Sequence, residues 1–165
     1  GCSLRPVVAH PGSGGKKKIW PLTRWWSLLR WLAARCRNPL LVTLGPADGV
    51  LAPFARATRA LGVELVEGQS LPFMTALLAG SACYFGSDSG ISHLAGCLDV
   101  PGAIFFGPTD PLIWAPVGRN VRALVDRWSD AEALAWTGDT VEAEVAPAVR
   151  AVVEDWLAAG ILERR

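Results

Sequence analysis

The sequence predicts one α/β domain with a doubly wound parallel sheet, covered by helices on both faces. Short apolar segments alternate along the chain with segments whose apolar residues recur at helical spacing. The short segments are apolar on both faces, which is typical of strands buried in a parallel sheet. With 165 residues, 51% hydrophobic and 19% charged, the chain is long enough for one buried core and is not expected to be disordered.

The predicted elements follow one another with short connections. The segments expected to be strands are 5–9, 40–44, 63–66, 82–85, 103–106 and 121–125. Helices are expected after Pro21, where apolar residues recur up to Cys36, and over 51–61, ending at Gly62. A third helix begins after Ser70, a predicted N-cap, and stops near Gly80. A fourth opens within 87–98, and a long closing helix is expected over 140–159, with valines including Val141 and Val145 on its apolar face.

Charge is distributed unevenly along the chain. The net charge is +1, but every charged residue within 1–37 is basic and the remainder has an acidic excess. A one-sided basic segment favours an anionic partner, either a phosphorylated ligand or an acidic membrane surface. Nucleic acid is disfavoured, because the domain as a whole is not basic. Trp26 and Trp31 fall off the apolar face of their helix and are interpreted as a surface for another domain or a membrane interface.

The cysteines indicate a reducing compartment. Cys2, Cys36, Cys83 and Cys97 show no CxxC spacing. They are interpreted as reduced core thiols of a cytosolic protein, and neither a disulfide frame nor a zinc site is expected. No apolar run reaches the roughly 20 residues of a membrane-spanning helix, and no cleavable signal peptide is expected.

Four predicted strands end in loops rich in Gly, Pro, Ser, Asp and Lys. These loops are 10–18, 45–49, 86–93 and 107–111. Ligands of open α/β sheets bind at the carboxyl ends of the strands, where backbone amides and helix N-termini can hold a phosphate. The four loops are therefore the candidate binding site.

The segment Gly86–His93 is the most informative of these loops. It follows a buried strand and opens a helix, which either Ser87 or Asp88 is expected to cap. His93 lies one turn further on, where it either donates to a phosphate or is fixed by Asp88. The alternative is a polar N-cap followed by an ordinary histidine. A hydrolase nucleophile elbow does not fit, since Asp88 stands where its serine would be.

The loop HPGSGGKKK brings lysines to a strand end without matching the dinucleotide or Walker A patterns. Either the lysines contact a phosphate as mobile point charges, or the loop is a solvated basic segment. Asp48, after a Gly-Pro turn, either caps the next helix or accepts the hydroxyls of a ribose.

In combination these stretches resemble the ADP-heptose:lipopolysaccharide heptosyltransferases, inverting enzymes of the GT-B architecture. The similarity lies in HPGSGGKKKIWP, LGPAD, the long stretch SLPFMTALLAGSACYFGSDSGISHLAGCLDVPGAIFFGPTDP and the closing helix. Its specific part is the D-[ST]-G-x-x-H element, followed by FGPTDP. The resemblance implies that residues 1–165 form the Rossmann-like, nucleotide-sugar-binding C-terminal half, and that an N-terminal acceptor domain lies outside this chain.

The resemblance also implies roles for individual residues. Those expected to bind the donor and its phosphates are Ser13, Lys18, Asp88, Ser89, Gly90 and His93. Asp48, where the family often has glutamate, would hold the ribose, and Gln69 would lie beside the adenine. No catalytic residue is assigned to this chain, because the family's general base comes from the N-terminal half. The chain alone is thus expected to bind nucleotide without turnover.

No metal or other cofactor is expected, because an oriented helix N-terminus, backbone amides and Lys18 can stabilise the departing diphosphate. The expected partners are ADP-heptose, the N-terminal domain and the lipopolysaccharide core acceptor, with peripheral contact at the inner membrane of the cytoplasm. Two alternatives remain open: a GT-B transferase for another nucleotide sugar, and a noncatalytic nucleotide-binding module. An α/β hydrolase would instead turn over esters.

Overall fold

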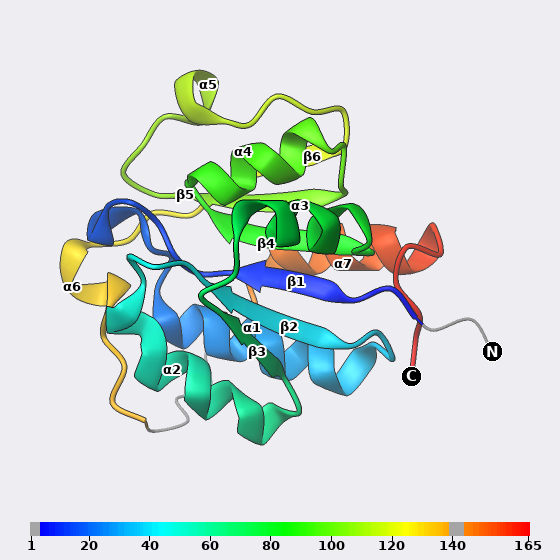
Figure 1. Ribbon diagram of the computed structural model, residues 1–165, viewed down its shortest axis with the longest axis horizontal. Coiled ribbons are helices and arrows are strands. Elements are labelled where there is room, and N and C mark those ends of the chain that lie inside the picture. The colour runs from blue at the N-terminus through cyan, green and yellow to red at the C-terminus, as the bar shows by residue number, and fades with distance from the viewer. Residues whose placement is uncertain (1–3, 139–143) are drawn as a thin grey trace.

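The computed structural model describes residues 4–138 and 144–165, which build a six-stranded parallel sheet (Figure 1). The strands are β1 (Val7–His10), β2 (Leu40–Leu44), β3 (Glu64–Glu67), β4 (Cys83–Ser87), β5 (Gly102–Phe106) and β6 (Val121–Val125). Their order is β3-β2-β1-β4-β5-β6, and every pairing is parallel. The order reverses between β1 and β4, which is the switch point where doubly wound folds bind ligands. The predicted fold class is confirmed.

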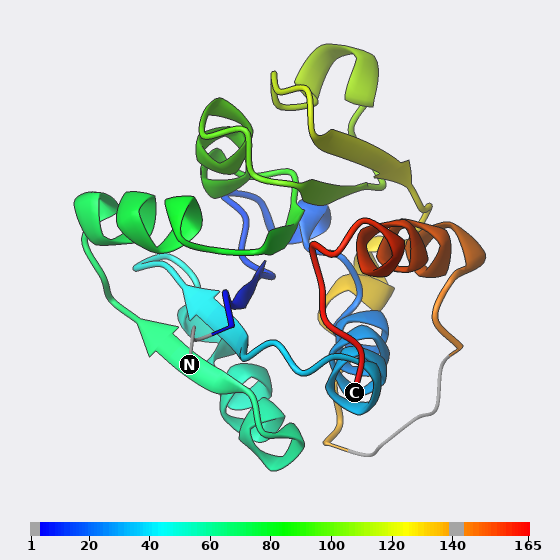
Figure 2. The ribbon, with the colours of Figure 1, turned by 90° about the vertical axis from the view of Figure 1, so that its right-hand side faces the viewer.

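Helices cover both faces of the sheet (Figures 1 and 2). One face carries α1 (Leu22–Arg35), α2 (Ala52–Ala57) and α7 (Pro147–Ala158). The other carries α3 (Leu71–Ala79) and α4 (Gly90–Cys97). Side chains of β4 alternate between the two cores, Cys83 and Phe85 on the first and Tyr84 on the second. The four inner strands are fully buried as predicted, whereas the edge strands β3 and β6 are partly exposed.

The closing helix is shorter than predicted. It begins at Pro147, whose ring fits the first turn but whose missing N–H would break a helix interior. Val145 precedes the helix and still packs into the core, while Val141 lies outside the described residues. The predicted helix 51–61 is instead α2 flanked by two 3₁₀ turns, Gly49–Leu51 and Thr58–Leu61, and it ends at Gly62, which has φ 77°. Two short helices were not predicted, α5 (Pro111–Trp114) and α6 (Asp130–Ala133).

The interpretation of Trp26 as a surface residue is wrong. Trp26 is 6% exposed and its ring lies 4.9 Å from that of Trp136. Helical spacing identified only the face of α1 that packs on the sheet, and the segment after α6 covers a second face. Trp31 is partly buried beneath the guanidinium of Arg35, 4.7 Å from the ring centroid.

The cysteine prediction is correct for two of the three described thiols. Cys36 and Cys83 are free and buried, and burial raises the pKa of both thiols. Cys97, at the end of α4, is free but exposed, so it is not a core residue; Cys2 lies outside the described residues. None of the helices within the described part of the chain is long and apolar enough to span a bilayer.

The basic N-terminal segment is balanced in part by acidic residues that follow β6. The ammonium of Lys17 lies 2.8 Å from the carboxylate of Asp130. Arg24 contacts Asp126 at 2.9 Å and Glu132 at 3.2 Å. These ion pairs therefore neutralise part of the basic excess of the N-terminal segment. They also link the segment after β1 to the segment after β6.

Candidate functional site

The four loops predicted to form a site meet at the carboxyl ends of the strands. The hydroxyl of Ser13, in the loop after β1, donates to the carbonyl oxygen of Asp88 at 2.7 Å. The hydroxyl of Thr109, in the loop after β5, donates to the Asp88 carboxylate at 2.9 Å. The loop after β2 joins them through Asp48, whose Oδ2 lies 3.7 Å from Nε2 of His10. Loops up to about one hundred residues apart in sequence thus line one site.

Asp88 lies at the centre of this site. The residue is 5% exposed, and its Oδ2 accepts from Thr109 and lies 3.0 Å from Nζ of Lys18. A buried carboxylate needs such partners, because leaving water without them is costly. Lys18 and Asp88, both predicted site residues, are therefore direct neighbours.

Of the three consecutive lysines, Lys18 contacts the site through Asp88, while Lys16 and Lys17 are exposed. The 3₁₀ turn Lys16–Lys18 follows the glycine-rich loop, and Lys17 is directed outward to Asp130. Lys18 also lies over the ring of Trp114 in α5, 5.3 Å from the centroid. Next along the chain, Trp20 anchors the turn: its ring stacks on Phe105 at 3.8 Å. The side chain of Lys18 is one-third exposed, so its ammonium remains accessible to a ligand.

The N-cap of α4 is Ser89, and neither Ser87 nor Asp88 as predicted. The Ser89 hydroxyl accepts from the amide of Ser92 at 3.4 Å. Ser87 is turned inward, where its hydroxyl donates to the carbonyl of Pro11 and accepts from the amide of Trp20. With Asp88 occupied by Lys18, only Ser89 is free to cap the helix.

The first turn of α4 is open towards the site. Whereas the amide of Ser92 is bonded to Ser89, the amides of Ile91 and Gly90 have no hydrogen-bond acceptor among the described residues. A methyl group added at Gly90 would meet nothing within 4 Å, so the space beside this amide is free. His93 is exposed, and its ring makes no hydrogen bond to any residue in the described part of the chain. The expected bond between His93 and Asp88 is not formed.

A buried hydroxyl network supports this turn from below, and sequence analysis missed it. The Tyr84 hydroxyl lies 3.0 Å from the Ser92 hydroxyl, which donates to the Ser87 carbonyl at 2.6 Å. Burial raises the pKa of Tyr84, so the phenol stays protonated. Gly86 is required beside it, because an added Cβ would lie 2.3 Å from the Tyr84 oxygen. Sequence analysis could not find this contact, because no sequence motif links a tyrosine in a strand to a serine eight residues later in the following helix.

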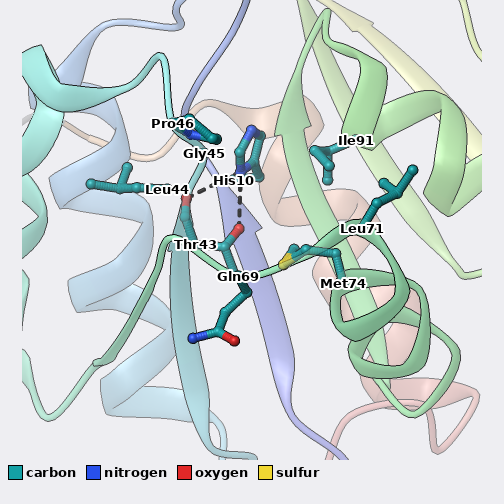
Figure 3. A pocket seen from close by; sticks show the side chains of 9 residues that line it. All are labelled: His10, Thr43, Leu44, Gly45, Pro46, Gln69, Leu71, Met74 and Ile91. Carbon is teal, nitrogen blue, oxygen red and sulfur yellow. Dashed lines mark hydrogen bonds between the residues drawn. The ribbon is translucent and has the colours of Figure 1, made fainter.

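A cavity of about 260 Å³ opens beside these loops, between β2 and α3 (Figure 3). Its lining is mostly apolar with a few polar groups, as in many small-molecule sites. The lining residues are His10, Thr43, Leu44, Gly45, Pro46, Gln69, Leu71, Met74 and Ile91. Gln69 therefore lines a cavity, and its expected position beside an adenine remains a prediction. Its amide donates to the carbonyl of Glu67 at 3.2 Å, and the residue is exposed.

Asp48 contacts two of the residues that line this cavity, His10 and Gly45. Its side chain makes no capping bond at the 3₁₀ turn that follows, and its Oδ2 instead accepts from the amide of Gly45 at 2.7 Å. The residue is 6% exposed and packs against Gly12, where an added Cβ would lie 2.1 Å from the carboxylate. The capping interpretation is wrong, and the predicted ribose contact remains a prediction.

His10 also lies at this site, although sequence analysis assigned no role to it. It ends β1 and is 5% exposed, with Nδ1 3.1 Å from the Thr43 carbonyl oxygen and 2.9 Å from the Thr43 hydroxyl (Figure 3). Burial lowers the pKa of the imidazole below its ordinary value, although the Asp48 carboxylate and the Thr43 carbonyl oppose this. The ring is therefore neutral near pH 7. The available signal was its position, as the last strand residue before a glycine-rich loop.

Stability should fall with acidification through His10. Burial lowers the pKa of the His10 imidazole in the folded state, so on acidification the unfolded chain binds a proton at this residue before the folded chain does. The contribution of the neutral ring to the free energy of unfolding is therefore complete above about pH 6.5 and is lost as the pH falls below it. Each pH unit in that window costs up to about 1.4 kcal/mol. In urea-unfolding measurements we expect His10→Asn to flatten the pH dependence of the free energy of unfolding between pH 6.5 and 5. An equal slope in the variant and the wild type would contradict this assignment.

Comparison with known proteins identifies the family of this chain. Residues 3–135 match the family described as Glycosyltransferase family 9 (heptosyltransferase). Lipopolysaccharide heptosyltransferase 1 of Pseudomonas aeruginosa is 38% identical over 119 residues, 69% of this chain and 32% of that protein. The protein of the same name from Escherichia coli K12 is 38% identical over 58 residues, 35% of this chain and 18% of its own length.

Solved structures share the fold. E. coli heptosyltransferase WaaC with ADP superimposes with a TM-score of 0.67 and 26% identity, covering 93% of this chain and 44% of WaaC. E. coli ADP-heptose lps heptosyltransferase II has a TM-score of 0.73 at 19% identity, covering 96% and 48%. This chain thus spans less than half the length of these proteins. The family match extends over most of its residues, and the chain belongs to glycosyltransferase family 9.

Proposed function

We propose that this chain is the donor-binding part of an inverting glycosyltransferase that transfers heptose from ADP-heptose to the lipopolysaccharide core. Family membership supports the reaction class. The similar WaaC structure is a complex with ADP, which supports an adenine nucleotide as the ligand. The curated relatives are lipopolysaccharide heptosyltransferases, which supports the sugar and the acceptor.

One observation carries the proposal: a lysine, an open helix N-terminus and an apolar cavity lie at the same edge of the sheet. Lys18 is 3.0 Å from Asp88, and Asp88 directly precedes the Ser89 cap of α4. The cavity that Gln69 lines begins at the neighbouring strands β1 and β2. A nucleotide with its base in this cavity would present its diphosphate to the α4 amides and Lys18.

These groups suit the chemistry of a departing nucleoside diphosphate. Cleavage of the sugar C1–O bond builds negative charge on the diphosphate, and oriented amides together with an ammonium stabilise that charge. Asp88 holds the ammonium of Lys18 in place until the ligand arrives. In this proposal the site needs no metal ion, and Ser13 and His93 contribute at its rim.

The remaining parts of the proposal concern partners. An N-terminal domain would supply the acceptor site and the general base that removes the proton of the attacking hydroxyl. The work of the complete enzyme would take place in the cytoplasm, with peripheral contact at the inner membrane where the lipopolysaccharide core is built. The 165-residue chain alone would bind nucleotide without transferring sugar.

Calorimetric titration of the chain with ADP, UDP and GDP, with and without EDTA, tests the proposal. Preferred binding of ADP that survives the chelator is the expected result. Preference for UDP or GDP would assign another nucleotide sugar, and loss of ADP binding in EDTA would contradict the metal-free site. No binding of any of the three would leave an interaction module without a nucleotide.

Gly90→Ala should separate binding from folding. Because the added methyl meets no protein atom within 4 Å, the melting temperature should stay the same or rise slightly. The methyl would occupy the space beside the first α4 amide and weaken ADP binding about tenfold, equivalent to about 1.4 kcal/mol. Unchanged ADP affinity would remove this amide from the phosphate site. Gly14→Ala, also in open space, is the matched control in the glycine-rich loop.

A further inference from the structure

We propose that His10 is a ligand-binding residue of this site, whose Nε2 accepts a hydrogen bond from a ribose hydroxyl of the nucleotide. The inference rests on the proposed function, since it requires a nucleoside in the cavity that His10 lines. It assigns a specificity role to a buried histidine at the end of β1, a residue that neither the charge pattern nor the phosphate-binding loops single out.

The tautomer of His10 follows from its partners. Nδ1 lies 3.1 Å from the carbonyl oxygen of Thr43, which can only accept, so Nδ1 carries the proton. The Thr43 hydroxyl, 2.9 Å from Nδ1, can accept as well because it lies within 3.5 Å of the Ala9 carbonyl to which it donates. In a neutral ring this leaves Nε2 with a lone pair and no proton.

Nε2 has no hydrogen-bond donor among the described residues. Its polar neighbour is Oδ2 of Asp48, at 3.7 Å, which is itself an acceptor and already receives the Gly45 amide. Two acceptors side by side repel each other unless a donor group binds there. A purely structural histidine would need only the Thr43 contacts, so the second nitrogen is the part of this side chain that the fold does not use.

The position of His10 selects the kind of donor. The ring lines the cavity together with Gln69, and the strand partner of His10 in β4 is Gly86 (Figure 3). A nucleotide that reaches from the base cavity to the α4 amides must pass its ribose along this edge of the sheet. The 2′ and 3′ hydroxyls of a ribose are adjacent donors, suited to two neighbouring acceptors.

The test compares ADP with 2′,3′-dideoxy-ADP on the wild-type chain and on His10→Asn. Asparagine can keep a donor towards Thr43 but has no counterpart of Nε2. We expect the wild type to prefer ADP by about tenfold or more, as one lost hydrogen bond implies. The variant should lose about tenfold in ADP affinity and bind the dideoxy nucleotide as the wild type does. Equal weakening for both nucleotides, or no change for either, would overturn the inference.

A second measurement uses the unaltered protein. In a chain labelled with ¹⁵N-histidine, the Nε2 resonance of neutral His10 should shift on titration with ADP and stay in place with the dideoxy nucleotide. ADP binding without a shift at Nε2 would overturn the inference and leave the proposed function standing. If the wild-type chain binds no ADP at all, the proposed function fails and this inference falls with it.

Discussion

Replacing Lys18 with methionine is expected to weaken ADP binding by one to two orders of magnitude. A hydrogen bond to a charged group contributes about 1.5–3 kcal/mol, which corresponds to that range of affinity. Methionine keeps most of the apolar stem and removes the ammonium, which contacts Asp88 and lies over the ring of Trp114. Calorimetric titration with ADP measures the effect, and the slope of binding against salt concentration should decrease as well.

Lys17→Met is the matched control, because it removes the same charge one residue away. Lys17 is 72% exposed and pairs with Asp130, which is 64% exposed, so the pair contributes little to stability and lies outside the site. ADP affinity should therefore stay within about twofold. If both variants lose ADP affinity equally, the lysines act only through the overall positive charge of the loop, and a direct contact of Lys18 with the nucleotide is contradicted.

Lys18→Met also leaves a buried carboxylate with one partner fewer. Asp88 would retain the bond from Thr109, and an uncompensated buried charge is destabilising. The double variant Lys18→Met, Asp88→Asn removes that charge and should recover melting temperature without recovering ADP affinity. Recovery of both together would show that the loss in Lys18→Met came from unfolding of the loop.

The sequence predicted the strands and the loops of this site because both are encoded locally. The inner strands appear as short apolar runs, and β2 and β6 were predicted within their observed bounds. Parallel strands place their carboxyl ends at one edge, so four polar loops had to meet there. Gly62 and Ser70 ended and began helices as their backbone preferences require.

The remaining features depend on contacts between distant residues. Three consecutive polar residues, Ser87, Asp88 and Ser89, are equally good caps in sequence, and Lys18 decides between them by engaging Asp88. Trp26 is buried by Trp136, more than one hundred residues later. His10 acquires its tautomer from Thr43 on the neighbouring strand, a pairing that becomes visible only once β1 and β2 are in register.

Gly86→Ala, at the end of β4, should strongly destabilise the domain. An added Cβ would lie 2.3 Å from the Tyr84 oxygen and 2.6 Å from the Ser92 oxygen, both in residues with no exposed surface. Overpacking a core costs about 1–3 kcal/mol, and a broken Tyr84–Ser92 hydrogen bond adds about 1 kcal/mol. Thermal unfolding should shift down by roughly 5–15 °C for a domain of this size.

Tyr84→Phe provides the compensating change for this variant. Removing the hydroxyl eliminates the shortest contact, although the ring carbon at 2.5 Å and the Ser92 oxygen remain, so the double variant should recover only part of the lost stability. Gly90→Ala, four residues later in open space, should melt like the wild type. If Gly86→Ala melted at the same temperature as Gly90→Ala, the domain would tolerate a methyl group beside the Tyr84 hydroxyl. The proposed role of the Tyr84–Ser92 hydrogen bond in supporting the first turn of α4 would then be contradicted.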